Sequence, residues 1–134
     1  MGDSSAYQKF TDLQVWQQAR ALKLEIYEMI KVFPKEEKFN LTDQIVRSVR
    51  SVSANISEGH GRFTYKEQLH FCIQARGSLS ETLNHLIDAQ DCRYIDLQTF
   101  QLIEQKIITV EKLLNGYITF LRNAGNTAKK ENDL

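Results

Sequence analysis

The sequence predicts an all-α protein, an antiparallel up-down-up-down four-helix bundle. Two observations predict it. The 134 residues contain one proline and six glycines, too few for the many turns of a β-protein. Apolar residues also recur at alternating spacings of three and four in four successive stretches, as in amphipathic helices. Because the stretches are joined by short connections, neighbouring helices are expected to run antiparallel.

The first two helices are bounded by recognisable signals. Thr11–Gln14 has the spacing of a capping box, and Pro34 should stop the first helix. Asn40 is placed to cap the second helix, which should run to the glycine turn at 59–61. The residues predicted to face the core are Val15, Ala19, Leu22, Ile26, Met29 and Phe33, then Leu41, Ile45, Val49, Val52 and Ile56.

The other two helices follow the glycine turn. A second capping box, Thr64–Glu67, opens the third helix, and Asp96 can cap a fourth of about 40 Å that ends at Gly125. Their predicted core residues are Tyr65, Leu69, Cys72, Leu79, Leu83 and Leu86, then Phe100, Ile103, Ile107, Val110, Leu114, Tyr117 and Leu121. The expected organisation is a flexible end (1–10), one bundle domain (11–125) and a polar tail (126–134).

Composition narrows the class of protein. Seventeen basic residues balance seventeen acidic ones, although residues 41–80 carry five basic against three acidic side chains. The two cysteines lack a paired spacing, and Cys72 falls on an apolar stripe, as expected of a core residue in a reducing compartment. No apolar run approaches the roughly 18 residues of a membrane span. These features predict a cytoplasmic protein.

The sequence contains only parts of the motifs that metal sites and nucleophilic catalysis require. A di-iron bundle needs two Glu-x-x-His motifs, and only Glu67–His70 has this pattern. Glu81 and His85 could share an ion, but the same spacing is common in ordinary contacts on a helix surface. Neither cysteine has a histidine at an activating spacing, and the glycine turn lacks the elements of a phosphate loop. We therefore predict no enzymatic activity, metal or cofactor.

A polar stripe on the second helix has two interpretations. It consists of Gln44, Ser48, Ser51, Asn55, Glu58 and Arg62. Asn55 and Glu58, with Arg62 or Arg76, could form a satisfied network that fastens the second helix to the third. Alternatively, the arginines could face outward and bind phosphate. The network is favoured for Asn55, Glu58 and Arg76.

The third predicted helix contains a glycine. Gly77 lies in the middle of this helix, where glycine costs up to about 1 kcal/mol relative to alanine. Such a glycine is best tolerated where another backbone comes close, so a close helix contact is expected there.

Other basic residues are placed away from the core stripe. Arg47 and Arg50 lie three residues apart on the second helix, and Lys66 begins the third. On the first helix, Arg20 and Lys23 are interleaved between Trp16 and Tyr27. A basic patch with aromatic neighbours is typical of nucleic-acid binding. A solvated helix face is the alternative, and spacing alone leaves both open.

Two helices have wider apolar stripes than a simple bundle needs. The extra residues are Trp16 and Tyr27 on the first helix and Leu102, Leu113 and Phe120 on the fourth. Either the core is broad, or these flanks meet another subunit. The aromatic content favours a homo-oligomer.

Three ordered motifs resemble those of one bacterial protein family. They are Leu13-x-Val15-Trp16-x-x-Ala19 with Phe33-Pro34-x-Glu36-Glu37-x-Phe39-x-Leu41-x-x-Gln44-x-x-Arg47, Asn55-Ile56-x-Glu58-Gly59-x-Gly61-Arg62, and Ala75-Arg76-Gly77-Ser78-Leu79-x-Glu81. The chain resembles the four-helix-bundle family of 23S rRNA intervening-sequence proteins, or S23 family, over residues 10–123. It departs from strongly basic members in its neutral charge and in Val46, where a second arginine often occurs.

The resemblance implies a small cytosolic bundle without known enzymatic activity. Some members of the family are encoded inside insertions in 23S rRNA genes. A related branch, the accessory protein of diversity-generating retroelements, is a pentamer that binds nucleic acid through basic surfaces. The resemblance therefore suggests a homo-oligomer, with a pentamer as the family precedent.

We accordingly expect a non-enzymatic homo-oligomer that binds RNA or structured DNA. The predicted phosphate contacts are Arg47, Arg50, Arg62 and Lys66, followed by Arg20 and Lys23. The residues assigned to the fold are Asn55, Glu58, Gly59, Arg76, Gly77 and Glu81. The alternative is a protein-interaction scaffold that acts through the flanks of the first and fourth helices.

Overall fold

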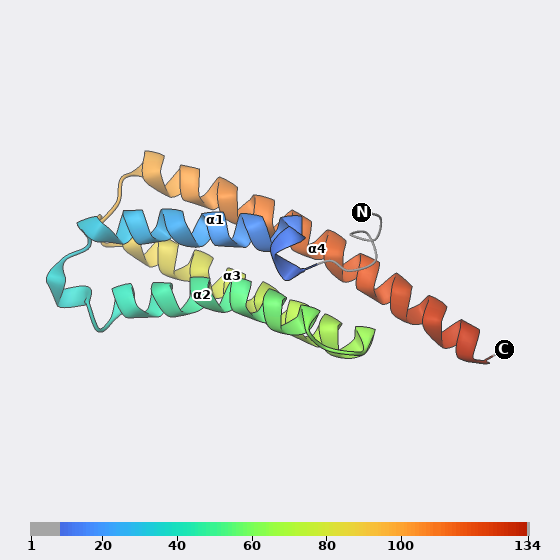
Figure 1. Ribbon diagram of the computed structural model, residues 1–134. Helices are drawn as coiled ribbons and strands as arrows, with labels where there is room; N and C mark the ends of the chain where they lie inside the picture. Colours follow the sequence, from blue (N-terminus) through green and yellow to red (C-terminus); the bar gives the residue numbers. More distant parts are fainter. Residues whose placement is uncertain (1–8, 134) are drawn as a thin grey trace.

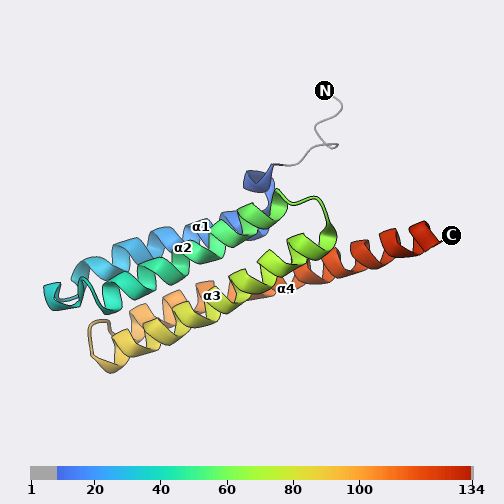
Figure 2. The same ribbon diagram turned by 90° about the horizontal axis from the view of Figure 1, so that it is seen from below.

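The chain folds as four helices in which each runs opposite to the one before it (Figure 1). The computed structural model describes residues 9–133, and side chains up to residue 128. The four helices are α1 (Gln14–Met29), α2 (Leu41–His60), α3 (Tyr65–Asp91) and α4 (Leu97–Asp133). Three 3-10 turns accompany them: η2 (Phe10–Asp12), η3 (Ile30–Val32) and η4 (Lys35–Glu37). Figure 2 shows α1 beside α2 and α3 beside α4, so the bundle has two layers. The all-α prediction is confirmed.

The core lies where the apolar stripes predict it on α1 and α2. On these two helices every predicted core residue within the helix is buried. On α3 the prediction is partly wrong: Tyr65 is exposed, whereas Thr82 and His85 are buried. Thr82 is buried in the α2–α3 contact, where its hydroxyl lies 2.9 Å from Ser48 Oγ. The core residues contributed by α4 are Ile103, Ile107, Val110, Leu114, Ile118 and Leu121.

Two of the four predicted helix caps form. The backbone N–H of Glu67 donates to Thr64 Oγ1 at 3.1 Å, and that of Thr99 donates to Asp96 Oδ1 at 2.8 Å. The Thr11 cap is wrong, because Thr11 lies in η2 and Leu13 occupies the N-cap position. Asn40 is at the N-cap of α2, but its side chain makes no capping bond.

Helix α4 is longer than predicted. It continues through Gly125 to Asp133, so the expected end at Gly125 is wrong and most of the predicted tail is helical. Its 37 residues correspond to about 55 Å, and its last turns project beyond the other helices (Figure 1). A Cβ at Gly125 would lie 3.4 Å from the Cβ of Tyr65. Gly125 therefore lies beside the start of α3, within α4. The predicted flexible end lies mostly outside the described residues, although Phe10 belongs to η2.

The glycines assigned to the fold have different environments. Gly59 lies inside α2, where an added Cβ would be 2.8 Å from Phe71 Cβ and 3.2 Å from the Gln68 carbonyl oxygen. It permits close packing of α2 on α3. Gly77 has no atom within 4 Å of such a Cβ, so the close helix contact expected there is wrong. Among the described residues, no helix has both the length and the apolar character needed to cross a membrane.

Candidate nucleic-acid interface

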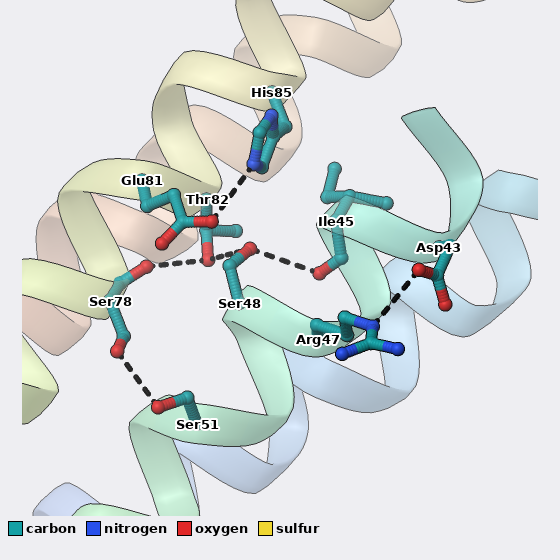
Figure 3. Close-up of polar contacts among 9 residues, drawn as sticks. All are labelled: Asp43, Ile45, Arg47, Ser48, Ser51, Ser78, Glu81, Thr82 and His85. Carbon is teal, nitrogen blue, oxygen red and sulfur yellow. Dashed lines mark hydrogen bonds and ion pairs between the residues drawn. The ribbon is translucent and has the colours of Figure 1, made fainter. Parts of the chain in front are cut away.

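Side-chain hydroxyls join the middle of α2 to the middle of α3 (Figure 3). Ser78 Oγ donates to Ser51 Oγ at 2.9 Å, and the Thr82 hydroxyl lies 2.9 Å from Ser48 Oγ. Ser48 and Thr82 are both buried, and the Ser48 hydroxyl donates to the Ile45 carbonyl oxygen at 3.1 Å. Buried hydroxyls with partners avoid the cost of unmet hydrogen bonds. We call these four residues the hydroxyl ladder; they fasten α2 to α3.

The polar network predicted for this hairpin used the wrong residues. Asn55 donates to the Ser51 carbonyl oxygen at 2.8 Å and to Ser51 Oγ at 2.9 Å, within α2. Glu58 pairs with Arg62 at 3.1 Å, one turn away. Arg76 Nη1 donates to Asn115 Oδ1 on α4 at 3.2 Å. Only Arg76 therefore bridges two helices, and it joins α3 to α4. The side chains that link α2 to α3 in the seam are instead the hydroxyls of Ser48, Ser51, Ser78 and Thr82.

Glu81 and His85 form a contact within α3 at the edge of the same seam. His85 Nε2 lies 3.1 Å from Glu81 Oε2, and the imidazole is largely buried (Figure 3). His85 Nδ1 has no hydrogen-bond partner in the described structure. Among the described residues, no three His, Cys, Asp or Glu side chains gather as a metal site would require.

Four of the six predicted phosphate contacts lie on one face formed by α1 and α2. Arg50 Nε donates to the Tyr27 hydroxyl at 2.7 Å, and its guanidinium lies 5.6 Å from the centre of that ring. Lys23 and Arg20 lie one and two turns before Tyr27, on the same side of α1. Arg47 lies one turn before Arg50 on α2. We call these four cations the basic face.

Carboxylates neutralise the basic face only in part. Arg47 Nε pairs with Asp43 at 2.9 Å, and the Arg47 side chain remains 78% exposed. Among the described side chains, Arg20, Lys23 and Arg50 have no carboxylate oxygen within 4.0 Å. Three of the four cations are therefore available to an anionic ligand. An exposed ion pair such as Arg47–Asp43 is worth about 0–1 kcal/mol, so a phosphate can compete with Asp43.

The other two predicted phosphate contacts lie at the end of the molecule, near the α2–α3 turn. Arg62 is held by Glu58 and by the face of Phe71, whose ring centre is 4.8 Å from the guanidinium carbon. Arg62 and Lys66 line a shallow hollow of about 430 Å³ with Glu67, His70 and Phe71. The structure thus divides the six cations between the basic face and this hollow.

A second groove beside the hollow was not predicted. Phe63, Tyr65 and Lys66 line it from the α2–α3 side, and Arg122 and Asn126 line it from α4. Its volume is about 770 Å³, within the range of about 300–1,000 Å³ for ligand pockets. We call it the turn groove. The prediction that Tyr65 belongs to the core, and that α4 ends at Gly125, excludes such a groove, and both predictions are wrong. A phenylalanine inside the polar turn was the signal that could have found it.

The residues predicted to form an oligomer interface lie on two sides of the bundle. Leu102 lines an apolar groove of about 570 Å³ between α1 and α4 with Leu24. Leu113 lines another hollow between these helices, and Phe120 stacks on Tyr117 at 6.0 Å. Tyr27 instead contacts Arg50 on the α2 side, and Trp16 lies three turns earlier on that side of α1. The structure does not bring the five residues into one patch.

The resolved pKa shifts belong to groups outside the basic face. Burial raises the pKa of the Cys72 thiol to about 11 and that of Tyr117 to about 12. The hydrogen bond that Tyr94 donates to Glu37 at 2.7 Å raises the pKa of Tyr94 to about 12. The backbone N–H of Thr99 lowers the pKa of Asp96, which caps α4. These shifts report on burial, a tertiary hydrogen bond and a helix cap.

Comparison with known proteins places the chain in a family. No significant match was found among curated proteins. Among solved structures, the chain is similar to a protein of unknown function from the S23 ribosomal protein family of Bacteroides thetaiotaomicron. The two are 25% identical with a TM-score of 0.72, over 78% of this chain and 97% of that one. The family model described as 23S rRNA-intervening sequence protein matches residues 11–116. The chain therefore belongs to the 23S rRNA-intervening sequence protein family.

Proposed function

We propose that this protein is a non-enzymatic homo-oligomer that binds RNA or another structured nucleic acid through its basic face. The observation that carries the proposal is the grouping of Arg20, Lys23, Arg47 and Arg50 on one side of α1 and α2, three of them without a described carboxylate partner.

The contacts of the basic face suit recognition of a phosphate backbone. Arginine presents a planar fork of donors that matches phosphate oxygens. The Arg50–Tyr27 hydrogen bond fixes one such fork in advance, which lowers the entropy lost on binding. Phosphate contacts supply affinity and orientation but little sequence information. We therefore expect the basic face to bind structured nucleic acids with little dependence on sequence.

The proposal is tested by fluorescence anisotropy with a labelled RNA hairpin and a random DNA duplex at two salt concentrations. Binding should weaken steeply with salt, because each neutralised phosphate releases condensed counterions. The Arg47→Glu/Arg50→Glu variant should bind much more weakly, with a salt slope smaller by about two. Arg93→Glu/Lys112→Glu changes the net charge equally at exposed positions outside the basic face and is the matched control.

Two outcomes would contradict the proposal. One is the absence of binding by the intact protein at low salt. The other is an equal loss of affinity in the control variant, which would mean that total charge and not the basic face governs binding.

A protein-interaction scaffold is the second candidate function. The apolar groove between α1 and α4 supports it, because Leu24 and Leu102 stand exposed beside each other there. Exposed apolar area of this kind often marks an interaction surface. In that case the Leu102→Lys variant would lose a protein partner, while nucleic-acid binding would be absent in the intact protein.

A further inference from the structure

The turn groove combines aromatic faces with cations outside the basic face. Phe63, in the α2–α3 connection, is 101% exposed, so its ring has no packing partner among the described residues. Tyr65, at the start of α3, is 40% exposed. A ring that packs on nothing adds no folding energy from burial. The position of Phe63 at the mouth of a groove therefore suggests contact with a ligand.

Positive charge surrounds these rings. Lys66 and Arg122 line the turn groove, and neither has a carboxylate oxygen within 4.0 Å among the described side chains. The nearby carboxylates are engaged elsewhere. Glu67 accepts a hydrogen bond from the Thr64 hydroxyl at 3.1 Å, and Glu58 pairs with Arg62. The groove is therefore suited to an anionic ligand with flat, apolar parts.

The turn groove shares one lining residue with the neighbouring hollow. Lys66 lines both, so the hollow around Arg62 and Phe71 lies next to the groove on α3. Cations and aromatic rings thus alternate along a path across the start of α3. Single-stranded nucleic acid, in which bases alternate with phosphates, has the matching arrangement.

We propose that the turn groove binds an unpaired segment of nucleic acid, with a base stacked on Phe63 and the adjacent phosphates at Lys66 and Arg122. A base inside a duplex has both faces covered, whereas an unpaired base in a loop, bulge or strand end can stack on an aromatic side chain. This inference rests on the proposed function. It adds to the basic face a site that distinguishes unpaired from paired nucleotides.

The test compares a labelled single-stranded RNA with a duplex of the same sequence, using the full chain and anisotropy. Phe63→Ala should weaken single-strand binding at least about fivefold and leave duplex binding within about twofold. Phe63→Trp should retain single-strand binding. Phe39→Ala is the matched control, because Phe39 is 81% exposed in the α1–α2 connection, at the other end of the molecule.

Other results overturn the inference in distinguishable ways. Unchanged single-strand affinity in Phe63→Ala, or an equal loss in Phe39→Ala, removes the stacking role while the Arg47→Glu/Arg50→Glu result still decides the proposed function. A lower sedimenting mass in Phe63→Ala would mean that a second copy of the chain occupies the groove. No binding of either RNA by the intact protein would overturn both proposals.

Discussion

Gly59 and Gly77 share a residue type and a helical setting but differ in their surroundings. Gly59 faces Phe71 across the α2–α3 contact, whereas a Cβ at Gly77 would meet open space. Glycine costs about 1 kcal/mol relative to alanine inside a helix. At Gly59 this cost is offset by the close approach of α3. At Gly77 the described structure offers no such compensation.

We therefore expect opposite effects from alanine at these two positions. Gly59→Ala should lower the free energy of unfolding by roughly 1–3 kcal/mol, because its Cβ forces Phe71 and the α3 backbone to move. Gly77→Ala should raise it by about 0.5–1 kcal/mol through helix propensity. Urea unfolding followed by circular dichroism measures both. An increase in both variants would contradict the assigned role of Gly59, and a decrease in both would contradict the open surroundings assigned to Gly77.

The individual cations show what sequence could and could not predict about the site. Spacing correctly placed Arg47 and Arg50 outside the core. It could not show that Arg50 meets Tyr27, because this contact joins residues 23 positions apart. Nor could it show that Arg62 and Lys66 lie apart from the other four cations, since that depends on where α2 ends in space.

At the scale of elements, the hydroxyl ladder is the feature most open to measurement. Thr82→Val keeps the side-chain shape but removes a buried hydroxyl that lies 2.9 Å from Ser48 Oγ. We expect this variant to lower the free energy of unfolding by about 1 kcal/mol. In a double-mutant cycle, Ser48→Ala and Thr82→Val should show a coupling energy of about 0.5 kcal/mol or more.

Ser57 provides the control for this cycle. Its hydroxyl donates to the Ala54 carbonyl oxygen at 2.9 Å, within α2. Ser57→Ala and Thr82→Val should therefore be additive. Equal coupling in both cycles would mean that the ladder does not act as a specific link between α2 and α3.

The helices themselves were largely predictable, and their ends were less so. Apolar periodicity located all four because each must bury one face. The predicted caps at Thr11 and Asn40 do not form. A capping side chain reaches the backbone N–H groups only in the right backbone conformation, and distant packing decides that conformation. The predicted end of α4 at Gly125 was wrong because a glycine can also lie inside a helix, and local sequence does not distinguish the two cases.

At the scale of the whole molecule, exposed apolar residues on α4 bear on assembly. Leu102 and Phe120 are 60% and 58% exposed. We expect the protein to sediment above its monomer mass at micromolar concentrations. The Leu102→Lys/Phe120→Lys variant should sediment with a lower mass. Leu97→Lys/Phe39→Lys is the control, because both side chains are exposed outside this flank. A monomer at all concentrations would exclude the homo-oligomer.

Stability should fall at alkaline pH through three groups with raised pKa values. The folded state holds the protons of Cys72, Tyr94 and Tyr117 more tightly than the unfolded state does. Their contribution is full below the ordinary pKa values of 9.0 and 10.0 and is lost as pH rises to about 11–12. Urea unfolding between neutral pH and pH 11 should show this decline. Tyr94→Phe/Tyr117→Phe should make it shallower, and an unchanged slope would contradict the assignment.

The even number of helices has a practical consequence for experiments. The start of α1 and the end of α4 lie at the same end of the bundle as the α2–α3 turn (Figure 1). A tag or fused protein that follows α4 would therefore be carried close to the turn groove. Cys92, an exposed thiol in the α3–α4 connection, lies at the opposite end, whereas Cys72 is buried. A maleimide dye on Cys92 would thus give a single reporter placed away from the groove.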